Sequence, residues 1–338
     1  MKKVVLYLNL GTPDHPEKKA VKRYLKEFLM DPFVIDIPKW VRWPLVNLII
    51  APFRSGKSAH AYQSIWTKEG SPLLVNSKKL VEKLQAQLNL MAPGRYEVLL
   101  GMRYGQPSLK KMAEVIVSGG AQEVLLLPAY PQYALSSTET AFVEAENQLR
   151  AAGFKGRLQR LQDYYEDSRF VEAVAEKIEA VQKSFQPDHL LFSYHGLPKR
   201  HLTRLHPECS FNTCCLVPSE KNRKCYRHQS FMSTQALTKK MNLKTEDYSI
   251  GFQSRLGTGW IQPFSDEVVE ELAKKGVKRL AVVCPSFTAD CLETLEEISI
   301  RAKETFLEAG GEDLILVPCV NDSEKWAQGL AQMVKDEF

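Results

Sequence analysis

Short apolar runs alternate with longer amphipathic stretches along the chain, and this alternation most limits the folds open to it. The apolar runs predict strands at 3–8, 97–102, 123–127, 158–162, 189–194, 248–253, 279–284 and 313–317. Their apolar character is continuous, which is typical of parallel strands covered on both faces. Helical periodicity lies between them, for example at 171–185 and 268–275. The sequence therefore predicts an α/β protein with parallel sheets.

The second half of the chain repeats the turn signals of the first. Gly11-Thr12-Pro13 follows the first predicted strand, and Gly196-Leu197-Pro198 follows the fifth. Four strands in each half predict two similar Rossmann-like lobes, each a four-stranded parallel sheet flanked by helices, with a ligand cleft between them. The expected divisions are an N-terminal lobe over 1–165, a C-terminal lobe over 166–321, and a terminal helix over 322–338 that packs back on the N-terminal lobe.

Charge and hydropathy exclude several classes of protein. The chain has 45 Lys and Arg against 40 Asp and Glu, spread without long runs of one sign, so we expect no nucleic-acid partner. Apolar runs are too short for a membrane-spanning helix. The apolar residues after Lys3 are interrupted at Asn9 and predict a first buried strand rather than a signal peptide. We therefore expect a cytoplasmic protein.

The segment 39–53 (KWVRWPLVNLIIAPF) breaks the strand–helix pattern with two Trp and two Pro residues, and it gives no clean helix or strand signal. One interpretation is a buried connection. The other is an exposed apolar lip, about 39–57, for a large apolar ligand or for peripheral contact with the inner membrane.

Residues 51–58 fit a loose P-loop pattern, but its first glycine is an alanine and Pro52 removes a backbone amide, so the pattern disfavours nucleotide binding. Arg54 and Lys57 remain as two cations one helical turn apart. Beside an apolar lip, this pair suits an amphiphilic ligand with carboxylates, to which Ser71 could add a donor.

Asp290, Glu293 and Glu297 stand at i, i+3 and i+7, and on a helix they would form one acidic stripe. Such stripes are often solvated faces. This one, however, follows the predicted strand 279–284, at the end of a sheet where ligand sites lie. Carboxylates held close together raise one another's pKa, which suits proton handling or transient cation binding.

His195 follows a predicted strand and precedes a Gly-Leu-Pro turn, which would direct its ring into the cleft. A structural histidine is the alternative. In the repeat between the two halves, His195 takes the place of Leu10, so one lobe would present a base where the other presents an apolar surface.

Cys209, Cys214, Cys215 and Cys225 lie in a polar, turn-rich insertion at about 206–226. Without a secretory signal, such a cluster favours a metal site over disulfides. Four thiolates suit either tetrahedral zinc or a [2Fe–2S] cluster, and the spacing leaves both open. Nearby histidines could replace a cysteine, namely His201, His206 and His228.

Eight blocks in order along most of the chain together resemble the ferrochelatase family: LNLGTP (8–13), FLMDP (28–32), YQSIWTKEGSPL (62–73), GMRYGQPS (101–108), PAYPQYALSST (128–138), FSYHGLPKR (192–200), FQSRLGTGW (252–260) and FTADCLETLEEI (287–298). The resemblance implies an enzyme that inserts Fe²⁺ into protoporphyrin IX to form protohaem, the last step of haem biosynthesis. It also implies a chelatase-like fold of two lobes, as the repeat predicts.

The resemblance further implies roles for individual residues. His195 and Glu293 would handle the substrate iron and the pyrrole protons, and Asp290 and Glu297 would continue an acidic path. The porphyrin-binding residues would be Leu10, Arg54, Lys57, Ser71, Arg103, Tyr104 and Trp260.

Two departures from the family pattern matter. Cys291 stands where some relatives carry a histidine, which puts in doubt any three-ligand iron site that needs that histidine. We also expect no C-terminal extension of the kind that bears cluster ligands in other members. The resemblance to bacterial members with an internal cluster implies that Cys209, Cys214, Cys215 and Cys225 hold [2Fe–2S], with structural zinc as the alternative.

The rival functions are insertion of iron into coproporphyrin III, insertion of cobalt by a chelatase of the same fold, and a porphyrin or haem carrier without turnover. The residues 130–133 (YPQY) and the apolar segment 39–53 favour protoporphyrin, whose vinyl groups are apolar.

Overall fold

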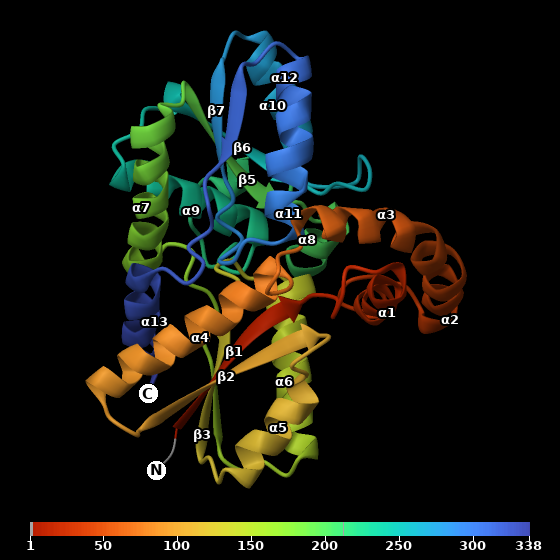
Figure 1. Cartoon of the computed structure of the whole chain (residues 1–338), viewed down its shortest axis with the longest axis vertical. Helices are drawn as coiled ribbons and strands as arrows, with labels where there is room; N and C mark the ends of the chain where they lie inside the picture. The colour runs from red at the N-terminus through yellow and green to blue at the C-terminus, as the bar shows by residue number, and fades with distance from the viewer. Residues whose placement is uncertain (1–2, 212) are drawn as a thin grey trace. The chain divides into compact units, whose positions relative to one another are not determined.

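The computed structural model describes residues 3–211 and 213–338, which form two compact units. The first unit holds Met1–Tyr130, Leu135–Gln162 and Asp322–Phe338, and the second holds Pro131–Ala134 and Asp163–Asn321. Each unit is built on one four-stranded parallel sheet (Figure 1). Among the described residues, no helix is both long enough and apolar enough to cross a membrane.

The sheet of the first unit has the strand order β2-β1-β3-β4. Its strands are β1 (Lys3–Gly11), β2 (Tyr96–Tyr104), β3 (Glu123–Pro128) and β4 (Arg157–Arg160). Its helices are α1 (Lys18–Leu29), α2 (Lys39–Pro44), η1 (Leu45–Ile50), α3 (Ala51–Ile65), α4 (Pro72–Met91), α5 (Leu109–Ser118), η2 (Leu135–Glu139), α6 (Thr140–Ala151) and α13 (Glu324–Glu337).

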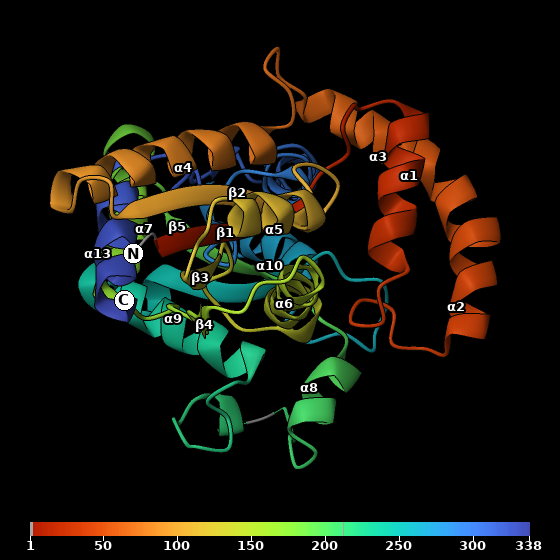
Figure 2. The same ribbon diagram turned by 90° about the horizontal axis from the view of Figure 1, so that it is seen from below.

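Both faces of this sheet are covered, which explains why β1 is apolar without alternation. Val4, Leu6 and Leu8 pack in one buried cluster with residues of α5 and α6. On the other face, the Asn9 amide donates to Ser77 Oγ of α4 at 3.0 Å. Figure 2 shows α4 on one side of β1 and β2, with α5 and α6 on the other. The terminal helix α13 belongs to this unit and contacts α4.

The sheet of the second unit has the equivalent order β6-β5-β7-β8. Its strands are β5 (His189–His195), β6 (Tyr248–Gln253), β7 (Arg279–Val283) and β8 (Asp313–Leu316). Its helices are α7 (Ser168–Phe185), α8 (Lys199–Leu205), η3 (Thr213–Cys215), α9 (Tyr226–Lys240), η4 (Thr245–Asp247), α10 (Ser265–Lys274), α11 (Leu292–Leu295), η5 (Glu297–Ala302) and α12 (Lys303–Glu308).

The second sheet is also enclosed on both faces. Leu191 packs in a buried cluster with residues of α10, η5 and α12, including Val269, Ile298 and Phe306. Helices α7 and α9 pack together on the opposite side (Figure 1). All strand bounds lie within two residues of the sequence-based expectation except the end of β1, where Asn9 to Gly11 extend the pairing with β2.

The segment 39–53 is helical, which its sequence did not indicate. It comprises α2, the π-helix η1 and the start of α3. Pro44 ends α2, and its missing N–H coincides with the change to π-helical hydrogen bonding. The P-loop pattern at 51–58 lies inside α3, so no phosphate-cradling loop exists there.

Candidate active site and thiolate cluster

His195 is the last residue of β5, at the carboxyl end of the second sheet. Its Nδ1 atom lies 2.6 Å from the carbonyl oxygen of Gly196. A carbonyl oxygen can only accept, so this contact places a proton on Nδ1, and in the neutral imidazole Nε2 then keeps its lone pair. The half-buried imidazole is thereby prepared to act as a base or as a metal ligand through Nε2.

The backbone around His195 is tightly fixed. Its N–H donates to Ser286 Oγ at 3.1 Å, and the N–H of Gly196 donates to the carbonyl oxygen of Gln253 at 2.8 Å. A Cβ atom on Gly196 would stand 2.6 Å from that oxygen. Only glycine allows this close approach, which explains the glycine that follows the strand.

Glu293 lies in α11 and Glu297 is the first residue of the π-helix η5. The expected helical stripe of three acids is wrong for Asp290, because the helix begins at Leu292 with Cys291 as its N-cap. Asp290 therefore lies in the preceding loop, and only two of the three carboxylates share the α11–η5 segment.

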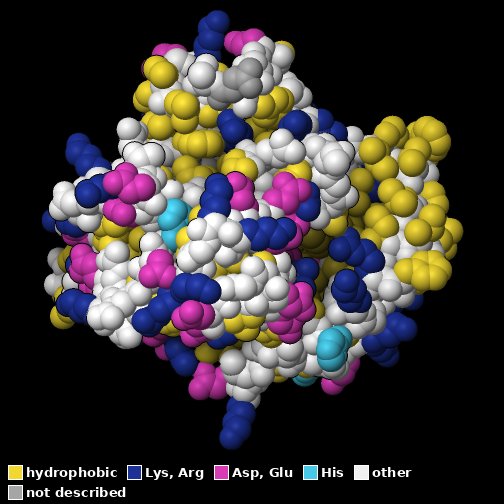
Figure 3. All heavy atoms as spheres, turned by 90° about the horizontal axis from the view of Figure 1, so that it is seen from above, with side chains coloured by type: hydrophobic (Ala, Val, Ile, Leu, Met, Phe, Trp, Pro, Cys, Tyr) yellow, Lys and Arg dark blue, Asp and Glu magenta, His cyan; other side chains and the backbone are white. Residues whose placement is uncertain are grey.

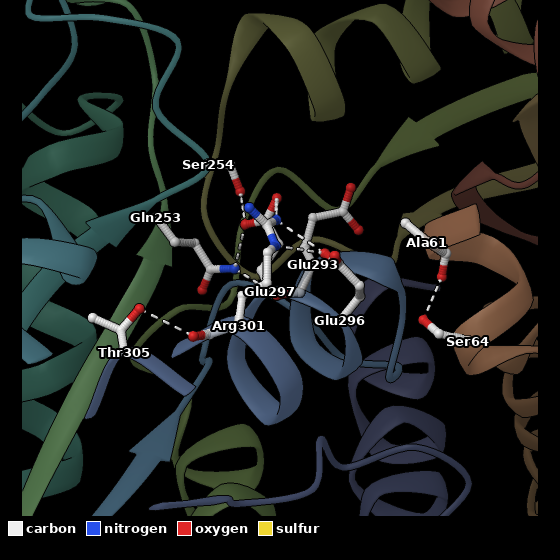
Figure 4. A network of polar contacts seen from close by, with 9 residues as sticks. All are labelled: Ala61, Ser64, Gln253, Ser254, Glu293, Glu296, Glu297, Arg301 and Thr305. Carbon is white, nitrogen blue, oxygen red and sulfur yellow. Dashed lines mark hydrogen bonds and ion pairs between the residues drawn. The ribbon is translucent and has the colours of Figure 1, made fainter. Parts of the chain in front are cut away.

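The Glu297 carboxylate accepts hydrogen bonds from Ser254 Oγ and, at 3.3 Å, from Gln253 Nε2 (Figure 4). Arg301 lies 3.3 Å from its other oxygen. Burial raises the pKa of Glu297 and the charge of Glu293 raises it further, while Ser254, His195 and Arg301 oppose the shift without cancelling it. A buried carboxyl group with a raised pKa can accept or release a proton nearer neutral pH than a free glutamate.

Asp290 is enclosed by donors rather than directed toward solvent. Its carboxylate accepts from Thr294 Oγ1 at 3.3 Å, from the N–H of Cys319 at 3.2 Å and from Asn321 Nδ2 at 2.7 Å. The N–H of Asp290 in turn donates to Asn321 Oδ1 at 2.8 Å. The carboxylate thus fastens the start of α11 to the chain after β8, and its expected place in an acidic path stays a prediction.

Cys284 and Cys291 add buried thiols to this region. Burial raises the pKa of both well above the ordinary value, and the charge of Glu293 contributes at Cys291. Both side chains are therefore neutral thiols near neutral pH. Cys284 Sγ donates to Gln253 Oε1 at 3.6 Å.

The expected porphyrin-binding residues differ in exposure. Arg54 and Lys57 are exposed on α3, while Leu10, Arg103 and Trp260 are half-buried. Ser71 is buried and its hydroxyl accepts from Thr12 Oγ1 at 2.8 Å. Ser71 and its partner thus present little surface to a ligand in this structure.

Tyr104 is fully buried, and its hydroxyl donates to Asp31 at 2.8 Å. The same buried carboxylate binds the Arg103 guanidinium and accepts from Thr140 Oγ1. The guanidinium also lies 4.5 Å from the centre of the Tyr104 ring. Tyr104 therefore supports Arg103, rather than offering the ligand-lining surface that was expected, because its polar atom is already bonded inside the unit.

The segment 39–53 presents a dense apolar surface. Trp40 is 79% exposed and Phe53 is 80% exposed, and Trp43, Leu48 and Ile49 are each more than half exposed. Figure 3 shows hydrophobic side chains gathered over this helical part of the first unit. The structure thus supports the exposed interpretation over the buried connection.

The four cysteines of the insertion come together. Cys214 Sγ lies 4.0 Å from Cys209 Sγ and 3.9 Å from Cys215 Sγ, and Cys215 interacts with Cys225. Arg227 donates to Cys215 Sγ at 3.0 Å. Across residues 3–211 and 213–338, no three His, Cys, Asp or Glu side chains are arranged to hold a single metal ion. The insertion includes residue 212, which lies outside the described part.

Sequence reasoning did not identify Gln253, Ser254 and Arg301, which contact Glu297, or Asp31, which holds Arg103. Gln253 ends β6, and the carboxyl ends of strands are where sites gather in parallel sheets. That positional rule would have found Gln253. Asp31 gave no comparable signal.

The two four-stranded parallel sheets place this chain in the class of proteins with a chelatase-like fold. The structure is similar to that of SirB from Bacillus subtilis solved with Fe³⁺, with a TM-score of 0.55 and 13% identity over 100% of this chain and 96% of that chain. A similarity at this level shows the fold, and it confirms the expected chelatase-like architecture of two four-stranded parallel sheets.

Sequence comparison then gives the family. The ferrochelatase family model matches residues 2–338. The ferrochelatase of Coxiella burnetii (strain CbuK_Q154) is 43% identical over 98% of this chain and 92% of its own length. That of Legionella pneumophila (strain Lens) is 43% identical over the whole of both chains. The chain belongs to the ferrochelatase family, as its sequence blocks predict.

Proposed function

We propose that this chain inserts Fe²⁺ into protoporphyrin IX, with His195 and Glu293 acting at the metal and at the pyrrole nitrogens. Membership of the ferrochelatase family makes it a metal chelatase, and iron and a porphyrin are its substrates. The single observation that supports these residues is the Nε2 lone pair of His195 at a strand end, close enough to the half-buried Glu297 for their charges to interact, as the charge of Glu293 also does.

The proton balance of the reaction explains the residue types. Two N–H protons leave the porphyrin as Fe²⁺ enters, so the site must accept two protons for each turnover. His195 Nε2 takes one of them, since an imidazole accepts protons near neutral pH. Glu293 takes the other and passes it to Glu297, whose raised pKa allows it to hold a proton before releasing it to water.

Binding at a distance from the reacting nitrogens supplies the energy to bend the ring. A planar porphyrin resists entry of the metal, and strain of this kind can be offset by contacts made far from the reacting atoms. Arg54 and Lys57, both exposed on α3, provide cations for the propionates. The guanidinium of Arg103, fixed by Asp31, supplies a rigid positive charge.

A competition assay tests the substrate. Purified protein is given Fe²⁺ under anaerobic conditions with equal protoporphyrin IX and coproporphyrin III, and both products are quantified. We expect a higher kcat/KM for protoporphyrin, because the apolar surface of 39–53 favours vinyl groups over carboxylates. Preference for the tetracarboxylate would assign coproporphyrin instead. Binding without insertion of any divalent metal would leave a carrier.

We further propose that Cys209, Cys214, Cys215 and Cys225 hold a [2Fe–2S] cluster. Two sulfur ligands on one tetrahedral metal at about 2.3 Å stand about 3.8 Å apart, close to the 4.0 Å between Cys209 Sγ and Cys214 Sγ. The interacting Cys215 and Cys225 offer the second pair of ligands that a two-iron cluster needs. When bound, such a cluster supplies one-electron chemistry. Arg227, through its bond to Cys215 Sγ, would stabilise the thiolate.

Metal analysis and visible spectroscopy distinguish the two candidate groups. A red-brown protein whose absorption bleaches on reduction, with iron and sulfide in equal amounts, supports the cluster. A colourless protein with stoichiometric zinc would assign structural zinc instead. Cys214→Ser should remove the colour, while Cys319→Ser, a buried cysteine elsewhere in the same unit, should retain it.

We also propose peripheral contact between the 39–53 segment and the cytoplasmic side of the inner membrane, which would make the protein cytoplasmic with a reversible membrane contact. Its exposed Trp40 and Phe53 carry the argument. Sedimentation with anionic phospholipid vesicles should recover the wild type, and a Trp40→Ser/Phe53→Ser variant should lose most of that recovery. Leu90→Ser, a comparably exposed leucine on α4, serves as the control. Equal recovery of all three proteins would contradict this proposal.

A further inference from the structure

The side chain of Gln253 connects the strand that carries His195 to the segment that carries both glutamates. It is only 5% exposed at the end of β6, in register with His195 of β5. Its Nε2 donates to the carbonyl oxygen of Glu293 at 2.6 Å and to the Glu297 carboxylate at 3.3 Å. One amide group therefore contacts both acidic residues of the proposed site.

The other end of the same amide is fixed by two donors. Gln253 Oε1 accepts from Ser193 Oγ at 2.8 Å and from Cys284 Sγ at 3.6 Å. Because the Ser193 hydroxyl donates to Gln253, it accepts in turn from Ser265 Oγ at 2.7 Å. These donors occupy the oxygen, so the NH₂ group must face the glutamates. The orientation of the amide is thus set by buried side chains of the second unit.

We propose that Gln253 is a positioning residue for metal insertion, which holds the Glu293 turn and the Glu297 carboxylate at a fixed place relative to His195. Ser193 acts through Gln253 by setting which way its amide faces. The inference rests on the proposed roles of His195 and Glu293, and it assigns a function to two residues outside them. A neutral amide suits this place because it can donate to a carboxylate without adding a charge to the site.

Substitution of Gln253 separates its donor from its acceptor. Gln253→Met removes both hydrogen-bonding groups at similar volume, and Gln253→Glu keeps the acceptor for Ser193 but loses the donors. A displacement near 1 Å can cost about 100-fold in rate. We expect both variants to lose about 10- to 100-fold in kcat, with the porphyrin dissociation constant unchanged within about twofold. Gln235→Met, an exposed glutamine on α9, is the matched control and should retain the wild-type kcat.

A double-mutant cycle tests the route through Ser193. Ser193→Ala should lower kcat by about threefold, and the Ser193→Ala/Gln253→Met double variant should be no slower than Gln253→Met alone. Thermal melting and porphyrin fluorescence confirm that each variant is folded and binds ligand. Additive losses, or a loss in porphyrin affinity equal to the loss in kcat/KM, would overturn the positioning role. Failure of the wild type to insert metal would instead overturn the proposed function, so the two failures are distinguishable.

Discussion

The two sheets have equivalent strand orders, yet the carboxyl ends of their equivalent edge strands, β2 and β6, carry side chains of different charge. In the first unit, the end of β2 presents Arg103, whose charge is balanced by Asp31 within the same unit. In the second, the end of β6 presents the neutral Gln253, which donates to the Glu297 carboxylate beside Arg301. The charge at this strand end is thus paired within the first unit, whereas the second unit places a neutral amide there.

The ends of β1 and β5 show how two similar backbones can carry different side chains at equivalent positions. Both strand ends rely on a glycine that permits close backbone approach, Gly11 in the first unit and Gly196 in the second. The residue before each glycine differs, with Leu10 in one and His195 in the other. The backbone frame is shared, so the function follows from a few side chains placed on it.

The largest expected effect compares those two equivalent positions. His195→Ala should lower kcat by about 10³-fold while porphyrin affinity changes less than about threefold, because general base catalysis contributes 10²- to 10⁴-fold. Leu10→Ala, the matched change in the other repeat, should lower kcat less than about tenfold, since it removes only apolar contact. Steady-state insertion kinetics and fluorescence titration measure both quantities. Equal losses in the two variants would remove the functional asymmetry.

Much of this arrangement is readable from the sequence, for physical reasons. Continuous apolar runs located the most buried strands of the described sheets, β1 and β5 above all, because strands covered on both faces are apolar without alternation. His195 was predicted because strand ends before tight turns hold sites. The acidic stripe was misjudged at Asp290, since α11 begins two residues later and a π-helix follows.

The remaining features depend on contacts that spacing cannot express. Asp31 and Arg103 are 72 residues apart, and nothing local to either residue indicates that they pair. The helical state of 39–53 was equally hidden, because its proline and aromatic content masks helical periodicity and its apolar face is exposed rather than buried. Prediction from sequence thus succeeds for the strands and their order along the chain, and it fails for polar side chains that pair across long distances in the sequence.

The next largest expected effect comes from the buried ion pair of Asp31 and Arg103 in the first unit. Asp31→Asn removes the partner of a largely buried guanidinium and should lower the free energy of unfolding by about 3 kcal/mol, the range found when a buried ion pair loses one member. Asp14→Asn, which breaks an exposed pair with Arg23, should cost less than about 1 kcal/mol. Urea denaturation of both variants measures these values. A cost for Asp31→Asn below that of Asp14→Asn would show that Arg103 is not held by its carboxylate.

A smaller effect is expected from Asp290, whose carboxylate is bonded inside the second unit. Asp290→Asn places an amide NH₂ group where the carboxylate now accepts from Thr294, Cys319 and Asn321, so at least one donor loses its acceptor. We expect a loss of about 1–3 kcal/mol in unfolding free energy. Activity per folded molecule should fall only a few-fold, because the Asp290 carboxylate is already occupied by donors that fix the start of α11. Complete loss of insertion in a fully folded variant would instead return Asp290 to an acidic path.

The smallest expected effect is a pH dependence of stability that arises from Glu297. Its pKa is raised in the folded protein, so between the ordinary value of 4.5 and the folded pKa the folded state binds more protons than the unfolded state. The contribution of Glu297 to the free energy of unfolding is therefore fully present below pH 4.5 and is lost as pH rises through the folded pKa.

The Glu297→Gln variant cannot titrate at this position, so its unfolding free energy should decline less over that interval than that of the wild type. Urea denaturation from pH 4.5 to 8 measures both slopes, with Glu296→Gln as the neighbouring control. Parallel slopes for wild type and Glu297→Gln would mean that Arg301, Ser254 and His195 together offset burial, and that Glu297 remains ionised throughout.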